Sequence, residues 1–385
     1  MKRLAIVTSH PIQYNAPLFE LLAKRKRIEI KVFYSWGESV LEQKYDPGFG
    51  KVIKWDIPLL EGYEYEFLEN ISKDKGSHNF KGIDNPDIIE KIKKFHPDAV
   101  LVYGWAYKSH LKVLRYFKNK IPVLFRGDST LLDERSWVAS LKRNLFLRWV
   151  YRHIDFALYV GKNNYKYFRN AGLNKDQLIF APHAVDNQRF ECSSATCKKN
   201  AVQLRDDLNI PEGDLVFMYA GKLENVKDPG IILQAFSNLS FPPRVHLVIV
   251  GNGNLESDLK TKSKSVANIH FIDFQNQMQM PAVYEIADIF ILSSKSETWG
   301  LSVNEAMANG KAIIVSDQCG CFSDLVAEGI NGYIFKAGNA IDLQMKMELI
   351  LQNISNLAEM KRKSSEKIKM FSLPIVAAAI EKILT

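Results

Sequence analysis

Long apolar runs and cysteines are scarce in this chain. The uninterrupted apolar stretches 247–250 and 375–380 are far shorter than the roughly 20 residues that cross a bilayer. The opening segment MKRLAIVTS is too short in its apolar part for a secretory signal. Four cysteines among 385 residues do not make a disulfide framework. These absences favour a protein of the reducing cytoplasm over a secreted or membrane-spanning one.

Charge is distributed unevenly along a chain of otherwise globular composition. Hydrophobic residues make up 46% and charged residues 24%, which excludes wholesale disorder, collagen and coiled coil. Residues 1–192 carry 32 lysines and arginines against 22 acidic residues, whereas residues 193–385 carry 19 against 21. The first half is therefore expected to attract an anionic membrane surface, a phosphorylated acceptor or nucleic acid. No aromatic RNA-binding motif or recognition-helix pattern occurs, so we predict no nucleic-acid partner.

Short β-rich runs alternate with helical stretches from one end of the chain to the other. Such alternation is typical of parallel sheets covered by helices. The predicted strands are 4–8, 28–34, 99–103, 121–125, 156–160, 216–220, 245–250, 269–271, 289–292 and 312–316. Because they form two groups of five, the sequence predicts an α/β protein with two doubly wound, Rossmann-like domains.

The domain boundary is predicted from the short polar segment CSSATCKKN at 192–200. We predict an amino-terminal domain of residues 1–192 plus 370–385 and a carboxyl-terminal domain of residues 193–369. Residues 35–97 are less regular and indicate a hairpin or long loops. The last segment predicts an amphipathic helix whose Pro374 lies in the first turn, where a missing N–H costs little.

The strongest motif is ETWGLSVNEAMANG at 297–310, between two predicted strands. This loop-to-helix turn falls at the carboxyl edge of a parallel sheet, where such sheets bind ligands. A helix that begins near Leu301 points N–H groups and its positive dipole end at that edge, which favours a phosphate. Glu297 and Glu305 would flank the phosphate and accept hydrogen bonds from sugar hydroxyls. Taken alone, the two acids are more simply interpreted as an N-cap acid and a surface acid.

Two lysines follow the predicted strand 216–220, again at a carboxyl end. The sequence GKLENVK places Lys222 and Lys227 five residues apart, after Gly221, whose small size permits close backbone approach. The two lysines could clamp a diphosphate from the side opposite the helix. An isolated pair of lysines is usually solvated surface. The interpretation of GKLENVK as a diphosphate clamp therefore depends on the motif at 297–310.

The segment VIVGNGNLE at 248–256 is a broken dinucleotide fingerprint. Glu256 stands at the place of the third glycine, where a bulky acid hinders helix packing and repels a pyrophosphate. We interpret the segment as a tight turn near a nucleotide, and we disfavour an NAD-dependent oxidoreductase.

Together these motifs make residues 214–336 similar to the carboxyl-terminal domain of GT4-type glycosyltransferases. The resemblance lies in GKLENVK, VIVGNGNLESDL, the stretch from IHFIDF to AIIVS, and NGYIF. It implies the GT-B fold, with two Rossmann-like domains facing across a crevice. It also implies retaining, hexosyltransferase-like transfer from a nucleotide-sugar without a metal or another cofactor. No Asp-x-Asp motif occurs, which agrees with metal independence.

The resemblance further implies a role for each residue of the donor site. Lys222 and Lys227 would neutralise the diphosphate, and Glu297 would contact the donor sugar. Glu305 would hold the ribose hydroxyls. The remaining donor-binding candidates are Gly221, Phe274 and Gln275 (the last two against the base), and Gly300, Leu301 and Ser302 at the helix start.

The amino-terminal half departs from the family pattern. The loop SHPIQYN replaces a glycine-rich loop, so His10, Gln13 and Tyr14 are candidates to contact acceptor or donor. Arg126 and Asp128 follow the strand where family members often carry a histidine. Arg126 is a candidate for phosphate binding and Asp128 for orienting an acceptor hydroxyl. Such single residues are explained equally well as structural residues that make hydrogen bonds within the fold. No residue is assigned as the general base.

The segment KRNLFLRWVYR at 142–152 interleaves cations with an apolar face. It predicts either a core-facing helix with a solvated side or contact with anionic lipid. Together with KRKR at 24–27 it favours a lipid-linked or membrane-embedded acceptor, and a peripheral position at the inner membrane face. The cysteine spacings C-x4-C and C-x-C match no paired zinc pattern, so no metal site is predicted.

We therefore predict a glycosyltransferase of polysaccharide biosynthesis, acting on a lipid-linked or cell-surface glycan precursor. Two alternatives stay open. A nucleotide-sugar epimerase on a similar fold would turn over the donor without an acceptor. A non-catalytic sugar-nucleotide-binding protein would use the same donor-site residues for binding alone.

Overall fold

The computed structural model describes residues 1–41, 44–46, 48–132, 137–239, 244–264, 266 and 268–384. Its internal contacts divide the chain into two compact units. Unit 1 comprises Met1–Lys44, Ile57–His183 and Leu373–Thr385, and unit 2 comprises Tyr45–Asp56 and Ala184–Ser372. The sequence placed its two boundaries at 192–193 and 369–370, and it did not indicate that residues 45–56 group with the second unit.

Unit 1 is built on a parallel seven-stranded sheet in the order β5-β2-β1-β6-β7-β8-β9. The inner strands are continuous apolar runs, as strands buried on both faces must be. The strands are β1 (Lys2–Thr8), β2 (Ile28–Tyr34), β5 (Glu64–Phe67), β6 (Ala99–Tyr103), β7 (Val123–Arg126), β8 (Phe156–Tyr159) and β9 (Leu178–Phe180).

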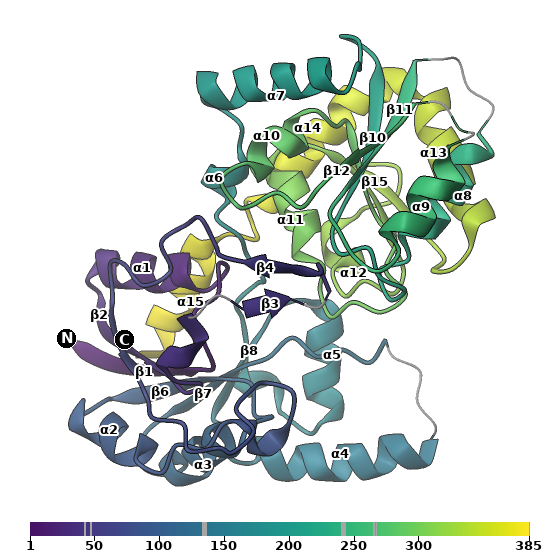
Figure 1. The fold of residues 1–385 in the computed structure, drawn as a ribbon. Coiled ribbons are helices and arrows are strands. Elements are labelled where there is room, and N and C mark those ends of the chain that lie inside the picture. The colour runs from purple at the N-terminus through teal and green to yellow at the C-terminus, as the bar shows by residue number, and fades with distance from the viewer. Residues whose placement is uncertain are drawn as a thin grey trace. The chain divides into compact units, whose positions relative to one another are not determined.

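Helices cover both faces of this sheet (Figure 1). On one face α1 (Ala16–Arg25) packs against the last helix, α15 (Leu373–Leu384), where Arg25 pairs with the nearly buried Glu381 at 2.7 Å. The other face forms a large apolar core with the remaining helices. These are α2 (Ile88–Lys94), α3 (Lys108–Phe117), α4 (Trp137–Tyr151) and α5 (Lys162–Asn170).

Unit 2 contains a parallel six-stranded sheet in the order β12-β11-β10-β13-β14-β15. The strands are β10 (Leu215–Ala220), β11 (Val245–Val250), β12 (Ile269–Ile272), β13 (Ile289–Leu292), β14 (Ala312–Ser316) and β15 (Gly332–Phe335). The strand order reverses beside β10, so the sheet is doubly wound like that of unit 1, as predicted.

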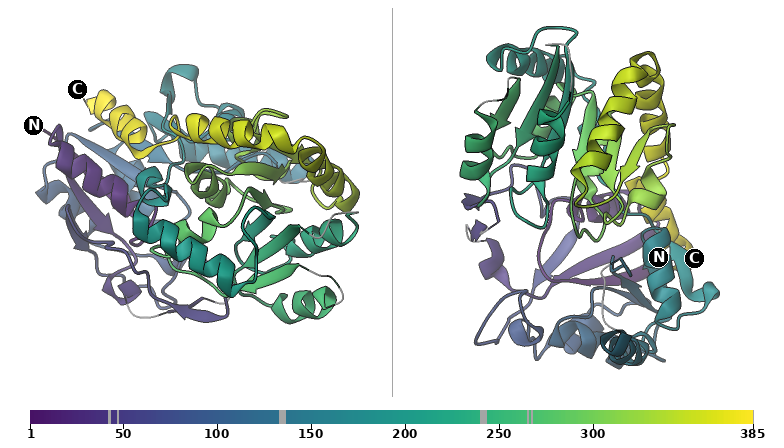
Figure 2. Two further views of the ribbon diagram at one scale, coloured as in Figure 1. Left: turned by 90° about the horizontal axis from the view of Figure 1, so that it is seen from above. Right: turned by 90° about the vertical axis from the view of Figure 1, so that its right-hand side faces the viewer.

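Two layers of helices enclose the second sheet, and Figure 2 shows them from two further directions. One layer holds α8 (Pro229–Ser237), α9 (Glu256–Ser263) and α13 (Ala340–Gln352). The other holds α10 (Met280–Glu285), α11 (Leu301–Ala308) and α14 (Leu357–Ile368). The shorter or peripheral elements are α6 (Asn187–Phe190), α7 (Ala195–Asp207) and α12 (Phe322–Leu325), and the two-stranded β3 (Lys44–Asp46) and β4 (Lys51–Ile53). Four 3-10 turns span Glu38–Leu41, Phe80–Gly82, Lys175–Gln177 and Ile354–Asn356.

All ten predicted strands are present, with ends that differ by at most two residues. The strands that the sequence did not predict in the two large sheets are β5, β9 and β15, each three or four residues long. All three lie at a sheet edge, where the neighbouring strand supplies the hydrogen bonds that make the segment extended. The predicted hairpin in 35–97 corresponds to β3 and β4.

Two of the four cysteines are bonded to each other in the structure. Cys192 and Cys197 are joined by a disulfide across the turn that leads into α7, a pairing that the sequence did not predict. Their Cα atoms are 5.5 Å apart, within the usual disulfide range.

In the part of the chain that the structure describes, none of the helices combines the length and the apolar character that crossing a membrane requires.

His110 is expected to make unit 1 less stable in acid. The ring is fully buried, with Nδ1 donating to the Tyr103 carbonyl at 2.9 Å and Nε2 2.8 Å from Ser35 Oγ. Burial lowers the pKa of His110 from 6.5 to about 4. Between these values the unfolded chain binds a proton that the native chain excludes, so stability is complete above about 6.5 and falls toward pH 4, by about 3 kcal/mol at most. Urea unfolding of His110→Gln between pH 4 and 7 should show a shallower pH dependence, whereas exposed His78→Gln should keep it.

Candidate functional site

The carboxyl ends of the parallel strands in unit 2 bring the main sequence motifs to one edge of the sheet. Because β10, β11, β12 and β13 all run in the same direction, the loops that follow them share this edge. These loops are residues 221–228, 251–255, 273–279 and 293–300. The predicted donor-site residues thus come from separate loops of one unit.

Helix α11 begins at Leu301, as the motif predicts, and Gly300 is its N-cap. Gly300 has φ +99°, and a Cβ there would lie 2.6 Å from the Leu292 side chain, so both backbone and packing require glycine. The buried Trp299 Nε1 donates to Asn304 Oδ1 at 2.8 Å and ties the loop to the helix. Gly300 has no side chain to cap the helix, so the first N–H groups, including those of Leu301 and Ser302, lack partners within the helix and are available to an anion.

Lys227 and Glu297 meet beside the start of this helix, where a Cβ on Gly300 would lie 3.6 Å from Glu297 Cγ. The Lys227 ammonium is paired with Glu297 Oε2, and both side chains are mostly buried. The backbone of Glu297 is held on both sides, since its N–H donates to the Gln318 carbonyl at 3.1 Å and its carbonyl accepts from Gly320 at 2.9 Å. The structure therefore brings together the residues predicted to contact the diphosphate and the donor sugar.

Glu305 lies one turn inside α11 and is only 4% exposed. Its Oε2 accepts a hydrogen bond of 2.7 Å from the hydroxyl of Tyr284, a fully buried residue of α10. The simpler interpretation, a surface acid, is wrong for this residue. The sequence did not single out Tyr284, because nothing in its spacing shows that α10 packs against α11.

Lys222 has a different partner from Lys227. Its ammonium lies 2.9 and 3.1 Å from the two carboxylate oxygens of Asp46, a residue 176 positions earlier. The preceding Gly221 has little room, since a Cβ there would lie 2.9 Å from the Tyr219 hydroxyl. The two predicted lysines thus lie at one edge of the sheet, but only Lys227 contacts Glu297. The sequence did not single out Asp46 as a partner of Lys222, because no pattern assigned the predicted hairpin to the second unit.

The glycines of the broken fingerprint have a structural explanation. A Cβ on Gly251 would lie 2.0 Å from the Gly221 carbonyl oxygen, and one on Gly253 would lie 2.4 Å from the Leu223 oxygen. The loop after β11 is therefore pressed against the loop after β10, which also joins it through Leu223 N–H and the Asn252 carbonyl at 3.0 Å. Glu256 accepts from Asn252 and Lys260. Close approach of two loops is enough to require these glycines.

Phe274 and Gln275 lie in the loop that follows β12, because the strand ends at Ile272. The N–H of Phe274 donates to Asn252 Oδ1 at 2.8 Å, which fixes the loop. Its ring meets Phe49 edge-on at 4.8 Å between centroids. Gln275 Nε2 donates to the Asp273 carbonyl at 3.1 Å. Contact of either residue with a base stays a prediction.

The candidates near β1 lie in one loop of unit 1. His10 Nδ1 is 2.9 Å from Ser9 Oγ, and its ring packs edge-on against Trp36 at 5.1 Å. Gln13 is buried and Tyr14 is half-buried. These surroundings are compatible with a binding loop and do not show a ligand.

Arg126 is engaged in structure. Its two terminal nitrogens donate to the carbonyls of Ala181 and Pro182 at 2.8 and 3.0 Å, and the side chain is buried. Asp128, two residues on, lies 3.5 Å from His183 Nε2. Arg126 therefore anchors the segment that leaves β9, and this geometry supports a structural role over a phosphate ligand.

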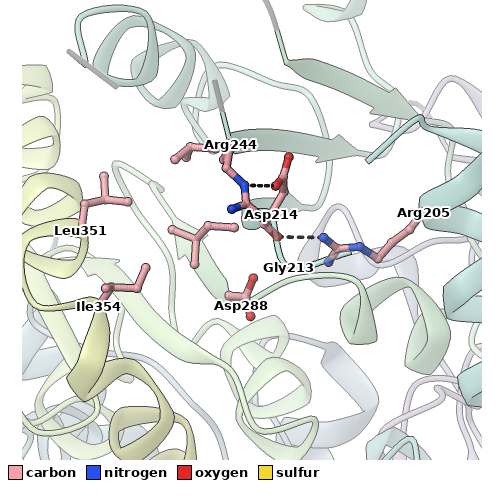
Figure 3. Close-up of a pocket in the computed structure, with 9 residues that line it drawn as sticks. Arg205, Gly213, Asp214, Arg244, Asp288, Leu351 and Ile354 are labelled. Carbon is pink, nitrogen blue, oxygen red and sulfur yellow. Dashed lines mark hydrogen bonds and ion pairs between the residues drawn. The ribbon is translucent and has the colours of Figure 1, made fainter. Parts of the chain in front are cut away.

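A pocket of about 540 Å³ lies at the opposite edge of the second sheet (Figure 3). It is lined by residues at the amino ends of β10, β11 and β13, including Asp214, Arg244 and Asp288. Arg244 pairs with Asp214 at 2.8 Å, and Arg205 donates to the Asp214 carbonyl at 2.7 Å. Arg244 and Asp214 neutralise each other, and the pocket is remote from the carboxyl edge that carries the motifs.

Known proteins resemble this chain in sequence. Residues 201–367 match the family model described as glycosyl transferases group 1, so the resemblance drawn from the sequence is confirmed. The chain is 23% identical over 284 residues to the sulfoquinovosyl transferase SQD2 of Arabidopsis thaliana, covering 70% of this chain and 52% of that protein. It is 22% identical over 313 residues to alpha-monoglucosyldiacylglycerol synthase of Acholeplasma laidlawii, covering 76% of each.

Solved structures show the same fold. HepE from Anabaena, in complex with UDP and glucose, aligns with 100% of this chain and 99% of its own at a TM-score of 0.70 and 15% identity. Sucrose-phosphate synthase from Thermosynechococcus elongatus aligns with 100% of this chain and 98% of its own at a TM-score of 0.75 and 17% identity. At this identity the likeness establishes the fold, which is GT-B.

Replacing Tyr284 by phenylalanine should destabilise unit 2 by about 1–3 kcal/mol, because the buried Glu305 loses a hydrogen-bond donor. Urea unfolding measures the change. Tyr333→Phe is the matched control, since Tyr333 is a half-buried tyrosine of β15 in the same unit. Equal stability of Tyr284→Phe and the control would show that Tyr284 does not support Glu305.

Proposed function

We propose that this chain, whose residues 201–367 match the group 1 glycosyltransferase family, transfers a sugar from a nucleotide-sugar to an acceptor hydroxyl with retention. The observation that carries the proposal is the Lys227–Glu297 pair, which lies beside the start of α11, whose N-cap Gly300 has no side chain. A cation and backbone N–H groups suit a diphosphate, and the nearby carboxylates suit sugar hydroxyls.

The chemistry of the leaving group supports this reading. As the bond from the sugar to the diphosphate breaks, positive charge grows on the sugar and negative charge on the diphosphate. Lys227, Lys222 and the start of α11 would stabilise that negative charge without a metal ion. Fixed groups aimed at a developing charge lower the barrier most effectively, because they need no reorganisation during the reaction. Glu297 would hold the sugar and Glu305 the ribose.

Two alternative functions would use the same donor-site residues. An epimerase would convert the nucleotide-sugar without an acceptor, and a binding protein would hold it unchanged. The basic composition of residues 1–192 favours transfer to an anionic or lipid-linked acceptor over either alternative. The relative from Acholeplasma laidlawii is named for synthesis of a glycolipid, which also points to such an acceptor.

We further propose that unit 1 contacts anionic membranes through a surface on α3 and α4. This aromatic–basic surface consists of Arg115, Leu145, Phe146, Trp149 and Arg152. Leu145 is 61% and Phe146 is 44% exposed, although apolar side chains of this size are usually buried. Phe146 stacks on Trp149 at 5.7 Å, and the guanidinium groups of Arg115 and Arg152 lie 5.6 and 5.9 Å from the Trp149 ring. Apolar side chains flanked by cations suit the headgroup region of a bilayer.

Titration calorimetry with UDP, GDP, ADP and CDP and their glucose conjugates tests the donor site. One base is expected to bind as both diphosphate and sugar conjugate, with affinity retained in EDTA. Glu305→Gln should weaken that binding about tenfold or more, since a hydrogen bond between an ionised group and a ligand hydroxyl is lost. Lys227→Met should slow turnover by about 10²–10³-fold.

The control is Lys260→Met, because Lys260 pairs with Glu256 on the surface of α9 in the same unit. It should leave binding and turnover unchanged. Absence of binding by all four nucleotides would contradict the proposal. Donor turnover without acceptor would establish the epimerase, and binding without turnover across a panel of acceptors would establish the binding protein.

Vesicle flotation tests the membrane contact. The double variant Leu145→Ser/Phe146→Ser should bind vesicles containing anionic phosphatidylglycerol about tenfold more weakly than the wild type, because two apolar side chains no longer enter the headgroup region. The matched control is Ile341→Ser/Met345→Ser, which changes two side chains of α13 that are also exposed. Equal loss in both double variants, or no binding by the wild type, would contradict the proposed contact.

A further inference from the structure

Residues 45–56 form a hairpin that belongs to unit 2 although its neighbours in sequence belong to unit 1. The hairpin packs against the loop after β12 at several points. The contacts are Lys51 with Asp273 at 3.1 Å, Asn276 Nδ2 with the Lys54 carbonyl at 2.6 Å, Met278 N–H with the Asp56 carboxylate at 3.2 Å, and Phe49 with Phe274 at 4.8 Å between ring centroids. The hairpin therefore lies at the same edge as the proposed donor site.

Asp46 is the charged residue that the hairpin presents to the proposed diphosphate lysine. Both of its oxygens lie within 3.1 Å of Lys222 Nζ. One oxygen also accepts from the N–H groups of Gly48 and Phe49 at 2.8 and 3.2 Å, which fixes the carboxylate in the turn. A Cβ on Gly48 would lie 2.6 Å from Lys222 Cδ, so the turn and the lysine are in direct contact.

The local environment keeps Asp46 ionised. Burial raises its pKa, but hydrogen bonds from Lys222 and from the backbone outweigh burial, and the net pKa lies below the ordinary value of 3.8. Lys222 is also 5.0 Å from the centre of the Phe49 ring, a favourable position for a cation. A fixed negative charge is therefore paired with the lysine that is proposed to bind the diphosphate.

The donor and its product differ in charge at this place. In a nucleotide-sugar the outer phosphate is esterified and carries one negative charge. After transfer the outer phosphate of the nucleoside diphosphate is free, and because its second pKa is near 6 it carries about two charges at pH 8. A fixed carboxylate repels the product more strongly than the donor.

We propose that Asp46 is a specificity-determining residue, which favours the nucleotide-sugar over the nucleoside diphosphate at the Lys222 subsite and so promotes product release. Asp46 and the incoming phosphate compete for the ammonium group of Lys222. The carboxylate of Asp46 also repels the ligand of higher charge more strongly. This inference rests on the proposed function, because it requires that Lys222 contacts the diphosphate.

The test compares the affinities of Asp46→Asn and the wild type at pH 8, by titration calorimetry. The probes are UDP, GDP, ADP and CDP and their glucose conjugates. For the base that binds, Asp46→Asn should tighten the diphosphate about tenfold and the sugar conjugate about threefold, since one repulsive charge is removed from ligands of unequal charge. In turnover assays the variant should show stronger inhibition by the diphosphate product.

The matched control is Asp56→Asn, the same substitution at the other end of the hairpin, where the carboxylate accepts from the Met278 backbone. It should leave both affinities unchanged. Equal tightening of diphosphate and sugar conjugate by Asp46→Asn, unchanged affinities, or the same effect from Asp56→Asn would each overturn the inference. If no nucleotide binds even the wild type, the proposed function itself fails, and the two failures are thereby distinguished.

Discussion

The start of helix α11 imposes the constraint on which the proposed chemistry of unit 2 depends. A helix that begins there directs unpaired N–H groups outward, and a negative group is the natural partner for them. Gly300 makes the sharp entry possible, and the bond between Trp299 and Asn304 holds the entry in place. Lys227 and Glu297 lie beside this point with opposite charges. A ligand with both a diphosphate and sugar hydroxyls would satisfy all of these groups, as the proposed function requires.

The loops that hold these residues depend on one another. The loop after β11 reaches its position because Gly251 and Gly253 allow it to touch the backbone at 221–223. Asn252 continues the contact to the loop after β12 through the N–H of Phe274. Backbone and side-chain contacts thus connect the loops after β10, β11 and β12 along the carboxyl edge. These contacts position side chains from distant parts of the sequence.

Burial separates the structural polar residues from those available to a ligand. Arg126 is buried and serves two carbonyl groups, so its charge stabilises unit 1 itself. Cys319 and Cys321 are fully buried, and burial raises the pKa of the Cys319 thiol to about 12, which makes both poor nucleophiles. The side chains of Lys222 and Lys227 are 31% and 23% exposed. The resemblance to a known family pointed to the latter two, and their role in donor binding stays a prediction.

Patterns in the sequence predict the two doubly wound units, the resemblance to group 1 glycosyltransferases and the helix that follows Gly300. Those features are encoded locally, in apolar runs, in the glycines and in the spacing of the two glutamates. The tertiary structure alone decided that Tyr284 supports Glu305, that Asp46 reaches Lys222, and that Arg126 is enclosed by a loop. Each of these contacts joins residues separated by 21 to 176 positions, and their distance in space is set by packing, which no local pattern records.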